Sequence, residues 1–389
     1  MTNIHVHELI AKTFSGLEPI LADELTKLGA TDVLLGKRMV SFKGDDALLY
    51  KANIYLRTAL RILKPLCSSP VKNTDQYYQF FRGIEWEKYM NLHHSFAIDT
   101  VANSKIFTNS LYAAQLAKDA IVDRFRDKYH KRPLVDTKQP KVLINVHISG
   151  EQINVSLDSS GETLNKRGYR TADGGAPLNE VLAAAMILNS GWDPKTPFID
   201  PMTGSGTLAI EAALIARNIP PGMLRKNFAF QNWPDYNKEL YTKIIDGIEL
   251  AEFRPKIFAN DISPEVIEMA KKNAQNALVS SFIRFNNESI TEYKPKAKEG
   301  TIIINPPYGE RLKPNEIDLL YSEIGTALKL NFSGMRAWIL SSNNDALKKI
   351  GLRPYKKLQL YNGGLLCWYN GFELFDGTFR DHKYPEAAS

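Results

Sequence analysis

Residues 197–217 read PFIDPMTGSGTLAIEAALIAR, and this stretch decides the fold class. A short apolar run ends at Asp200, two glycines follow in a tight turn, and an apolar helical segment begins at Thr207. Glycines let such a turn bend sharply and approach a ligand closely, while the helix after it presents free backbone N–H groups. The stretch therefore predicts a strand, a turn suited to a ligand and a helix.

The same alternation of strands and helices continues toward the C-terminal end. We expect further strands at residues 256–260, 282–285, 301–304, 336–340 and 365–369, and helices at 264–277 and 317–330. Strands that alternate with helices form a parallel sheet with helices on both faces. The predicted fold class is α/β with a Rossmann-like domain, and ligands bind beyond the carboxyl ends of the strands in such a sheet.

Two α+β units are predicted before this domain. The first combines an amphipathic helix with two short strands and a second helix. The second has a strand at 96–102, a helix at 110–125 with apolar residues at helical spacing, and a β-hairpin at 142–157. The small residues at 159–161 (Ser-Ser-Gly) and the Arg/Lys-rich stretch at 164–175 (LNKRGYRTADGG) suggest a linker into the α/β domain.

Composition and charge exclude several classes of protein. Lys and Arg number 49 against 43 Asp and Glu, so the net charge of +6 permits a polyanionic partner without demanding one. The two cysteines, Cys67 and Cys367, allow no disulfide framework, and no histidine spacing is typical of zinc ligands, so we expect no metal. No signal-peptide pattern and no membrane-length apolar run occurs, which predicts a cytoplasmic protein without a membrane partner.

The first two strand ends of the α/β domain carry candidate cofactor-binding residues. A carboxylate at Asp200 beside the loop of Thr203, Gly204 and Gly206 disfavours a phosphate and suits a cationic ligand such as S-adenosylmethionine. After the second strand, the pair Asp261-Ile262 supplies a carboxylate that can accept hydrogen bonds from ribose hydroxyls. The spacing between Gly204 and Asp261 far exceeds the roughly 20 residues that separate the glycine loop from the acidic residue in a nicotinamide dinucleotide unit. A helix-capping role for Asp261 is the alternative.

The fourth strand is followed by Asn305, Pro306, Pro307 and Tyr308, the most specific motif in the chain. Two prolines after a buried strand cannot donate ladder hydrogen bonds, so the backbone leaves the sheet there. The Asn305 side-chain oxygen and the Pro306 carbonyl can then accept the two hydrogens of an aromatic amino group. Tyr308 offers a ring on which a flipped-out base can stack. These four residues are the predicted catalytic residues, and a proline-rich turn without function is the alternative.

These motifs resemble those of a known family. Class I methyltransferases that act on amino nitrogens have similar first, second and fourth motifs, found here at 200–214 (DPMTGSGTLAIEAAL), 260–274 (NDISPEVIEMAKKNA) and 304–312 (INPPYGERL). Bacterial THUMP-domain RNA methyltransferases resemble the chain further at 14–29, 164–187 and 360–374. Within this family the chain resembles the guanine-N2 methyltransferase half of the large-subunit (23S) rRNA methylase, and the resemblance covers essentially the whole chain.

The resemblance implies the domain order and the cofactor. We expect a ferredoxin-like domain at 1–62, a THUMP RNA-binding domain at 63–158, and at 159–389 a linker and a class I methyltransferase domain with a seven-stranded, mostly parallel sheet. S-adenosylmethionine is the implied cofactor, with Asn305 lining its site. An acidic residue of the third motif is expected where Asn286-Asn287-Glu288-Ser289 stands, and Glu288 is the candidate for it.

The predicted function is methylation of an exocyclic amino nitrogen of an RNA base, in first place N2 of a guanine in 23S rRNA or a large-subunit precursor. We expect Arg167, Arg170 and Arg311 near the mouth of the site, where they would contact RNA phosphates or simply form solvated charge.

Three other substrates are alternatives, namely a tRNA guanine, DNA and protein, because the Asn-Pro-Pro-Tyr motif does not identify the substrate. A non-catalytic RNA-binding assembly factor is disfavoured by the intact motifs. A cysteine-nucleophile mechanism is disfavoured because neither cysteine follows a strand in such a motif.

Overall fold

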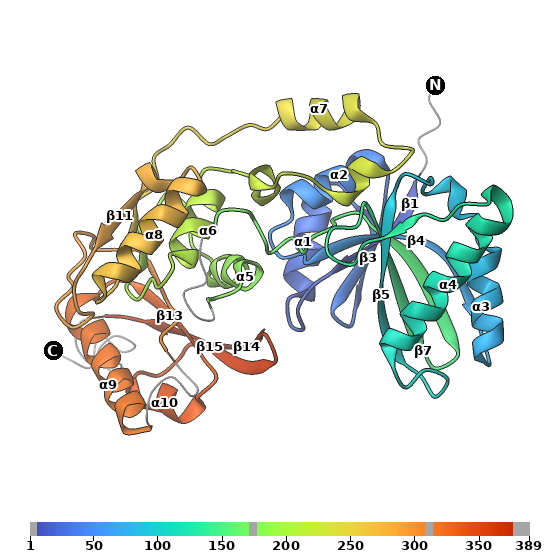
Figure 1. Ribbon diagram of the computed structural model, residues 1–389. Coiled ribbons are helices and arrows are strands. Elements are labelled where there is room, and N and C mark those ends of the chain that lie inside the picture. Colours follow the sequence, from blue (N-terminus) through green and yellow to red (C-terminus); the bar gives the residue numbers. More distant parts are fainter. Residues whose placement is uncertain (1–5, 171–176, 308–313, 376–389) are drawn as a thin grey trace. The chain divides into compact units, whose positions relative to one another are not determined.

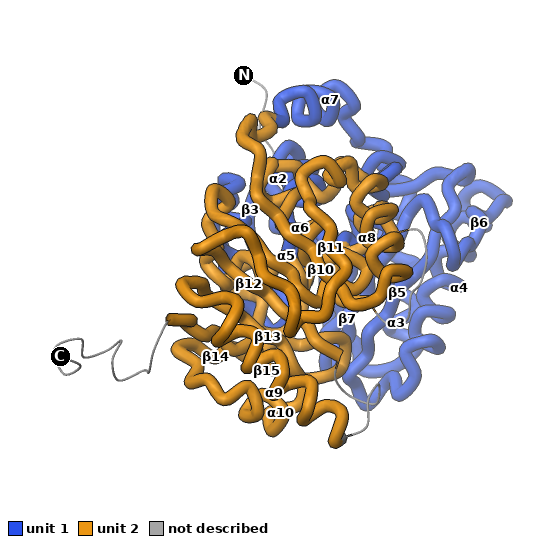
Figure 2. Tube along the Cα trace, turned by 90° about the vertical axis from the view of Figure 1, so that its left-hand side faces the viewer, with its two compact units in different colours: residues 1–13, 21–164, 225–248 blue, residues 14–20, 165–224, 249–389 orange. Residues whose placement is uncertain are grey.

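The computed structural model describes residues 6–170, 177–307 and 314–375 (Figure 1). The chain divides into two compact units, coloured separately in Figure 2. The first unit contains residues 1–13, 21–164 and 225–248, and the second contains residues 14–20, 165–224 and 249–389. Each unit takes in one segment from the other part of the sequence, and the expected domain boundaries stay a prediction.

The second unit contains the sheet that the glycine-turn stretch predicts. Its strands are β9 (Phe198–Asp200), β10 (Ile257–Asn260), β11 (Ile283–Asn286), β12 (Thr301–Ile304), β13 (Arg336–Ser341), β14 (Lys356–Asn362) and β15 (Leu365–Glu373). They lie in the order β11-β10-β9-β12-β13-β15-β14. The neighbouring strands β11, β10, β9, β12 and β13 are parallel to one another, and β15 pairs antiparallel with both β13 and β14. This confirms the predicted seven-stranded, mostly parallel sheet.

Helices pack on this sheet. They are α5 (Glu180–Ser190), α6 (Thr207–Ala216), α8 (Pro264–Asn276), α9 (Pro314–Asn331) and α10 (Asn344–Lys349), with 3-10 turns η2 (Pro221–Leu224) and η4 (Ser280–Phe282). Core residues of β9, β12 and β13 pack against α9 and α10, whereas α5 and α6 pack on each other and on β9, β10 and β12. The sequence prediction missed α5, because nearly all of its residues are buried and no amphipathic spacing marks it.

The first unit is built on one sheet of β1 (His7–Lys12), β2 (Thr31–Gly36), β3 (Met39–Gly44), β4 (Arg61–Pro70), β5 (Ser95–Asn103), β6 (Leu134–Val135), β7 (Val142–Ser149) and β8 (Gln152–Asp158). The order β2-β3-β1-β4-β8-β7-β5-β6 joins the two expected α+β units through the antiparallel pair β4–β8. Its helical segments are α1 (Glu18–Lys27, shared with the second unit), α2 (Asp46–Tyr55), α3 (Thr74–Gly83), η1 (Trp86–Lys88) and α4 (Ser110–Tyr129).

The first part of the expected linker, residues 159–161, packs within the first unit. The Ser159 and Ser160 side chains are fully buried, and both hydroxyls hydrogen-bond to the Asn53 side chain, at 2.8 and 2.7 Å. The Ser160 hydroxyl also accepts from the backbone N–H of Ile62 at 2.9 Å. Residues 159–161 have the composition of a loop, but here the two serine hydroxyls form hydrogen bonds with buried polar groups of α2 and β4.

Residues 225–248, which we call the return segment, leave the second part of the sequence and pack within the first unit. The segment carries η3 (Ala229–Asn232) and α7 (Lys238–Asp246). The Phe230 ring stacks on that of Tyr50 in α2 with centroids 4.5 Å apart, and the Tyr50 hydroxyl accepts from the backbone N–H of Asn237 at 3.0 Å. The Arg225 guanidinium donates to the backbone carbonyls of Ser160, Glu162 and Thr163. The return segment is therefore anchored by both aromatic and polar contacts.

A shorter segment, residues 14–20, belongs to the second unit. Gly16 adopts a φ of 87°, and a β-carbon on it would lie 2.9 Å from the backbone oxygen of Gln359 in β14. A side chain at this position would therefore both strain the backbone and clash with the strand. Each unit thus includes a segment that the sequence order assigns to the other.

Candidate cofactor-binding and catalytic site

The loop between β9 and α6 is shaped by two glycines in left-handed conformations. Gly204 has a φ of 53° and Gly206 a φ of 86°. A β-carbon on Gly206 would lie 3.1 Å from that of Ala270 in α8, so this glycine permits close packing of the two helices. Apart from its chain neighbours, no atom of the described chain lies within 4 Å of a β-carbon built on Gly204, and the N-cap residue of α6, Gly206, has no side chain that could cap the helix. The loop therefore leaves open space beside Gly204 at the N-terminal end of α6, an end that favours a negatively polarised group of a ligand.

Asp200, the last residue of β9, is fully buried. Its Oδ2 accepts a hydrogen bond of 2.7 Å from the Thr203 hydroxyl. Burial raises the pKa of Asp200 to about 7; the Thr203 hydroxyl opposes this rise and the charge of Asp261 adds to it. A buried carboxylate next to a second one produces a negative potential that a cationic ligand would relieve.

Asp261, directly after β10, holds the glycine loop. Its Oδ2 accepts from the backbone N–H of Gly204 at 2.9 Å, and its Oδ1 accepts from the backbone N–H of Ser263 at 3.2 Å. The N-cap of α8 is Ser263, whose hydroxyl accepts from the backbone N–H of Val266 at 3.3 Å. The alternative role of Asp261 as the helix cap is therefore taken by Ser263. The neighbouring Ile262 is exposed.

Asn305 lies directly after β12, which pairs with β9 on one side and β13 on the other. Its Oδ1 is buried and has no hydrogen-bond partner within the described chain. Pro306 is buried and Pro307 partly buried, as expected for a turn that leaves the sheet. An unpaired buried acceptor is costly, so its presence points to a donor group that a ligand supplies. Tyr308 and Arg311 lie outside the described residues.

Three family descriptions match successive parts of the chain: "RlmL ferredoxin-like domain" at residues 8–63, "THUMP domain" at 71–158, and "RMKL-like, methyltransferase domain" at 167–370, about half of the chain. The chain belongs to the RMKL-like methyltransferases. This membership confirms the resemblance to THUMP-domain RNA methyltransferases and the predicted fold class. It also confirms the predicted activity of an S-adenosylmethionine-dependent methyltransferase with an RNA substrate.

Individual relatives agree with this family. A Synechocystis protein, slr0064, which is named provisionally as an RNA methyltransferase, is 38% identical over 92% of this chain and 95% of its own length. The ribosomal RNA large subunit methyltransferase K/L of Buchnera aphidicola is 37% identical over 95% of this chain, which spans only 54% of that relative. The crystal structure of SMU.472, named provisionally as a methyltransferase and complexed with SAH, has a TM-score of 0.86 and 32% identity, covering 96% of this chain and 99% of its own.

Two of the arginines expected to contact RNA, Arg167 and Arg170, form contacts within this methyltransferase instead. Arg167 is 1% exposed, and its Nε lies 3.4 Å from a carboxylate oxygen of the buried Glu211 in α6. Arg170 is 19% exposed; it pairs with Glu180 and donates to the hydroxyls of Ser205 and Thr207 at 3.0 and 2.8 Å. The expectations of phosphate contact and of solvated charge are therefore both wrong for Arg167, whose side chain is almost fully buried beside Glu211. Arg170 instead fastens the glycine loop and the start of α6 to α5.

Glu288 follows β11 with an exposed side chain. Both of its backbone polar groups bind the Asn260 side chain: its N–H donates to Oδ1 at 3.1 Å and its carbonyl accepts from Nδ2 at 2.9 Å. The main chain at Glu288 is thus fixed beside the ends of β10 and β9. The role of its carboxylate as the acidic residue of the third motif stays a prediction.

Asn260, the last residue of β10, is a member of the site that sequence reasoning missed. It is fully buried, and all three of its side-chain hydrogen bonds are made to main-chain groups of neighbouring strand ends. A second asparagine, Asn273 in α8, donates to the backbone carbonyl of Ser205 at 2.9 Å. The available signal was the position of Asn260, directly before Asp261 at a strand end.

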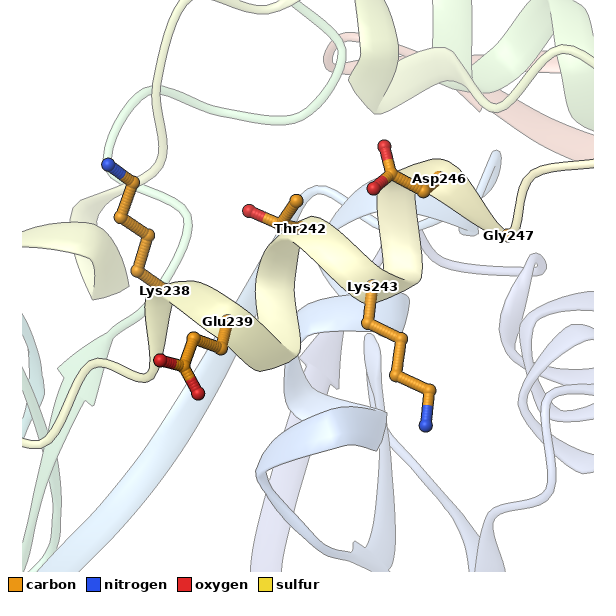
Figure 3. A pocket seen from close by; sticks show the side chains of 6 residues that line it. All are labelled: Lys238, Glu239, Thr242, Lys243, Asp246 and Gly247. Atoms are coloured by element: carbon orange, nitrogen blue, oxygen red, sulfur yellow. The ribbon is translucent and has the colours of Figure 1, made fainter.

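A hollow of about 610 Å³ lies elsewhere, along α7 in the first unit (Figure 3). Its lining consists of residues of this one helix and the glycine that follows it: Lys238, Glu239, Thr242, Lys243, Asp246 and Gly247. It contains none of the strand-end residues and is an open surface feature of the return segment. In the described ranges no three His, Cys, Asp or Glu side chains gather to hold a metal ion, and no helix there is long and apolar enough to cross a membrane.

Proposed function

We propose that the chain transfers the methyl group of S-adenosylmethionine to N2 of a guanine in 23S rRNA. The proposal rests on the family, on the match of residues 71–158 to a THUMP domain, and on the identity to a relative named for the large-subunit rRNA. Because the chain spans about half of that relative, the nucleotide and the RNA belong to the proposal. We further propose that the chain acts in the cytoplasm, where this RNA is found.

The observation that carries an amino-group target is the buried, unpaired Oδ1 of Asn305. An aromatic amino group has two hydrogens, and Asn305 together with the Pro306 carbonyl would accept both of them. This pairing would orient the nitrogen lone pair away from the protein toward the methyl group. Asn305 is no base, so its contribution is orientation, and the methylated nitrogen, positively charged after the transfer, loses its proton to solvent water.

The residues at the first two strand ends fit S-adenosylmethionine. When bound, this cofactor supplies an electrophilic methyl group on a positively charged sulfur. Asp200 and Asp261 provide negative potential, Gly204 leaves room beside the loop, and Asp261 can accept from ribose hydroxyls while it holds the loop. We propose Asp200, Thr203, Gly204, Gly206, Asp261, Ile262, Glu288 and Asn305 as the residues that line the cofactor site. Tyr308 is proposed to stack on the target base and Arg311 to contact phosphate.

The decisive experiment compares nucleosides from 23S rRNA and tRNA of cells with and without the gene by mass spectrometry. We expect one N2-methylguanosine in 23S rRNA to disappear and to return on expression of the wild-type chain but not of Asn305→Ala. In vitro, deproteinised 23S rRNA, unmodified tRNA and DNA are offered in parallel with labelled cofactor. Loss of a tRNA modification alone, or methylation of DNA alone, would overturn the 23S assignment. A chain that binds no cofactor in calorimetry would overturn the enzymatic function.

A further inference from the structure

The Asn260 side chain joins three separate strand ends. Its Nδ2 donates to the backbone carbonyl of Pro201, after β9, at 3.1 Å, and to that of Glu288, after β11, at 2.9 Å. Its Oδ1 accepts from the backbone N–H of Glu288 at 3.1 Å. With the residue at the end of β10 and fully buried, one amide group connects β10 to both of its neighbours.

The main chain around Asn260 adds to this connection. The backbone carbonyl of Asn260 accepts from the backbone N–H of Thr203 at 2.8 Å. In the opposite direction, the Asn287 side chain donates from the β11 exit to the backbone carbonyls of Asp261 and Ile262, at 2.8 and 2.9 Å. The exits of β10 and β11 are therefore tied by asparagine amides in both directions.

Only an amide of this length satisfies the environment of Asn260. Two backbone carbonyls need donors and one backbone N–H needs an acceptor, and an aspartate would supply acceptors alone. Parallel strands end their hydrogen-bond ladder at the same edge, so the loops beyond them need side-chain bonds to hold a fixed shape. The loops that Asn260 ties are the glycine loop and the segment at Glu288, which border the cofactor site.

We propose that Asn260 is a positioning residue for the methyl donor: it sets the spacing between the glycine loop and the β11 exit so that both can contact the cofactor at once. This inference rests on the proposed cofactor site but not on the identity of the RNA or the base. Both Nδ2 hydrogens and Oδ1 of Asn260 already engage main-chain groups, so we infer that it acts through the segments that it holds.

The test uses Asn260→Asp in the full chain, with S-adenosylhomocysteine affinity by calorimetry, thermal unfolding, and KM for RNA and kcat at saturating cofactor. We expect the dissociation constant for S-adenosylhomocysteine to rise at least about tenfold, since the bonds to the Pro201 and Glu288 carbonyls become repulsive contacts while only the bond from the Glu288 N–H is kept. KM for RNA should stay within about twofold and kcat within about threefold of wild type. The matched control is Asn53→Asp, also buried with three side-chain hydrogen bonds but located in the first unit.

Asn53→Asp should lower the unfolding temperature without changing cofactor affinity. Unchanged cofactor affinity in Asn260→Asp would overturn the inference, as would equal losses in cofactor affinity, KM for RNA and stability. If Asn260→Asp does not fold, Asn287→Ala provides the test. Removal of this exposed side chain should lower cofactor affinity about threefold or more at an unchanged unfolding temperature. Unchanged cofactor affinity in Asn287→Ala would overturn the inference. Failure of the wild type to bind S-adenosylhomocysteine would instead contradict the proposed cofactor site.

Discussion

The backbone N–H of Gly204 donates a 2.9 Å hydrogen bond to Oδ2 of Asp261. This bond joins the loop after β9 to the end of β10, two places in the sequence that suggested a cofactor site independently. Asp261 therefore has two tasks, to hold the glycine loop and to offer the remaining capacity of its carboxylate to a ribose. Both tasks use acceptors only, so a carboxylate suits them better than any neutral side chain.

Asp261→Ala should weaken cofactor binding by roughly 10- to 100-fold, the range of a lost hydrogen bond to a charged group. Asp261→Asn, which keeps one acceptor oxygen, should lose less cofactor affinity than Asp261→Ala. Calorimetric titration with S-adenosylhomocysteine measures both, and RNA affinity serves as the internal control because it should not change. Wild-type cofactor affinity in Asp261→Ala would contradict the role.

Asn305→Ala should reduce kcat at least about a hundredfold, because it removes an acceptor that orients the target amino group. Cofactor affinity should stay within a few-fold, since the side chain lies at the β12 exit rather than in the glycine loop. Single-turnover methylation of RNA together with calorimetry separates the two effects. A variant that still methylates at the wild-type rate would remove Asn305 from the mechanism.

Asp200→Asn should stabilise the protein at alkaline pH and not at acid pH. Burial raises the pKa of Asp200 from its usual value to about 7, so the carboxyl's contribution to stability is present below about pH 4 and is lost as pH rises through 7. The neutral amide escapes this loss, which is roughly 4 kcal/mol at most. Urea unfolding at pH 5 and pH 8 checks the sign: the gain over wild type should be larger at pH 8, and an equal gain at both would contradict the raised pKa.

Arg167→Ala should lower the free energy of unfolding by about 3–5 kcal/mol, because the Glu211 carboxylate would remain buried without this cationic partner, although it keeps the Tyr169 hydroxyl at 3.4 Å. The double variant Arg167→Met, Glu211→Leu should recover much of this loss. The dependence of RNA binding on salt concentration should be the same in the wild type and the double variant. A flatter salt dependence would restore Arg167 as a phosphate contact.

Phe230→Ala should destabilise the first unit, although the residue comes from the later part of the sequence. Loss of a buried ring that stacks on Tyr50 costs about 3–5 kcal/mol. Hydrogen exchange in α2 should accelerate, while Glu239→Ala on the exposed side of α7 should leave it unchanged. Unaltered protection of α2 would show that the return segment is not needed for the first unit.

The return segment also determines which truncations are informative. Deleting residues 1–158 would leave Phe228, Phe230 and Trp233 of that segment without their buried surroundings, and would remove residues 14–20 from the second unit. We expect such a fragment to be insoluble, which would say nothing of RNA recognition. Point substitutions in the full chain are the sound way to test the contribution of the first unit.

The sequence by itself determined the α/β sheet, its glycine loop, and the candidate residues Asp200, Asp261 and Asn305, because each of these stands next to a strand end and strand ends of a parallel sheet meet at one edge. Only the tertiary structure decided that Asn260 ties three strand ends, that Arg167 is buried against Glu211, and that Phe230 stacks on Tyr50. These are contacts between residues far apart in the chain. Periodicity and local spacing carry no trace of them, since burial and partner choice arise only when separate elements pack.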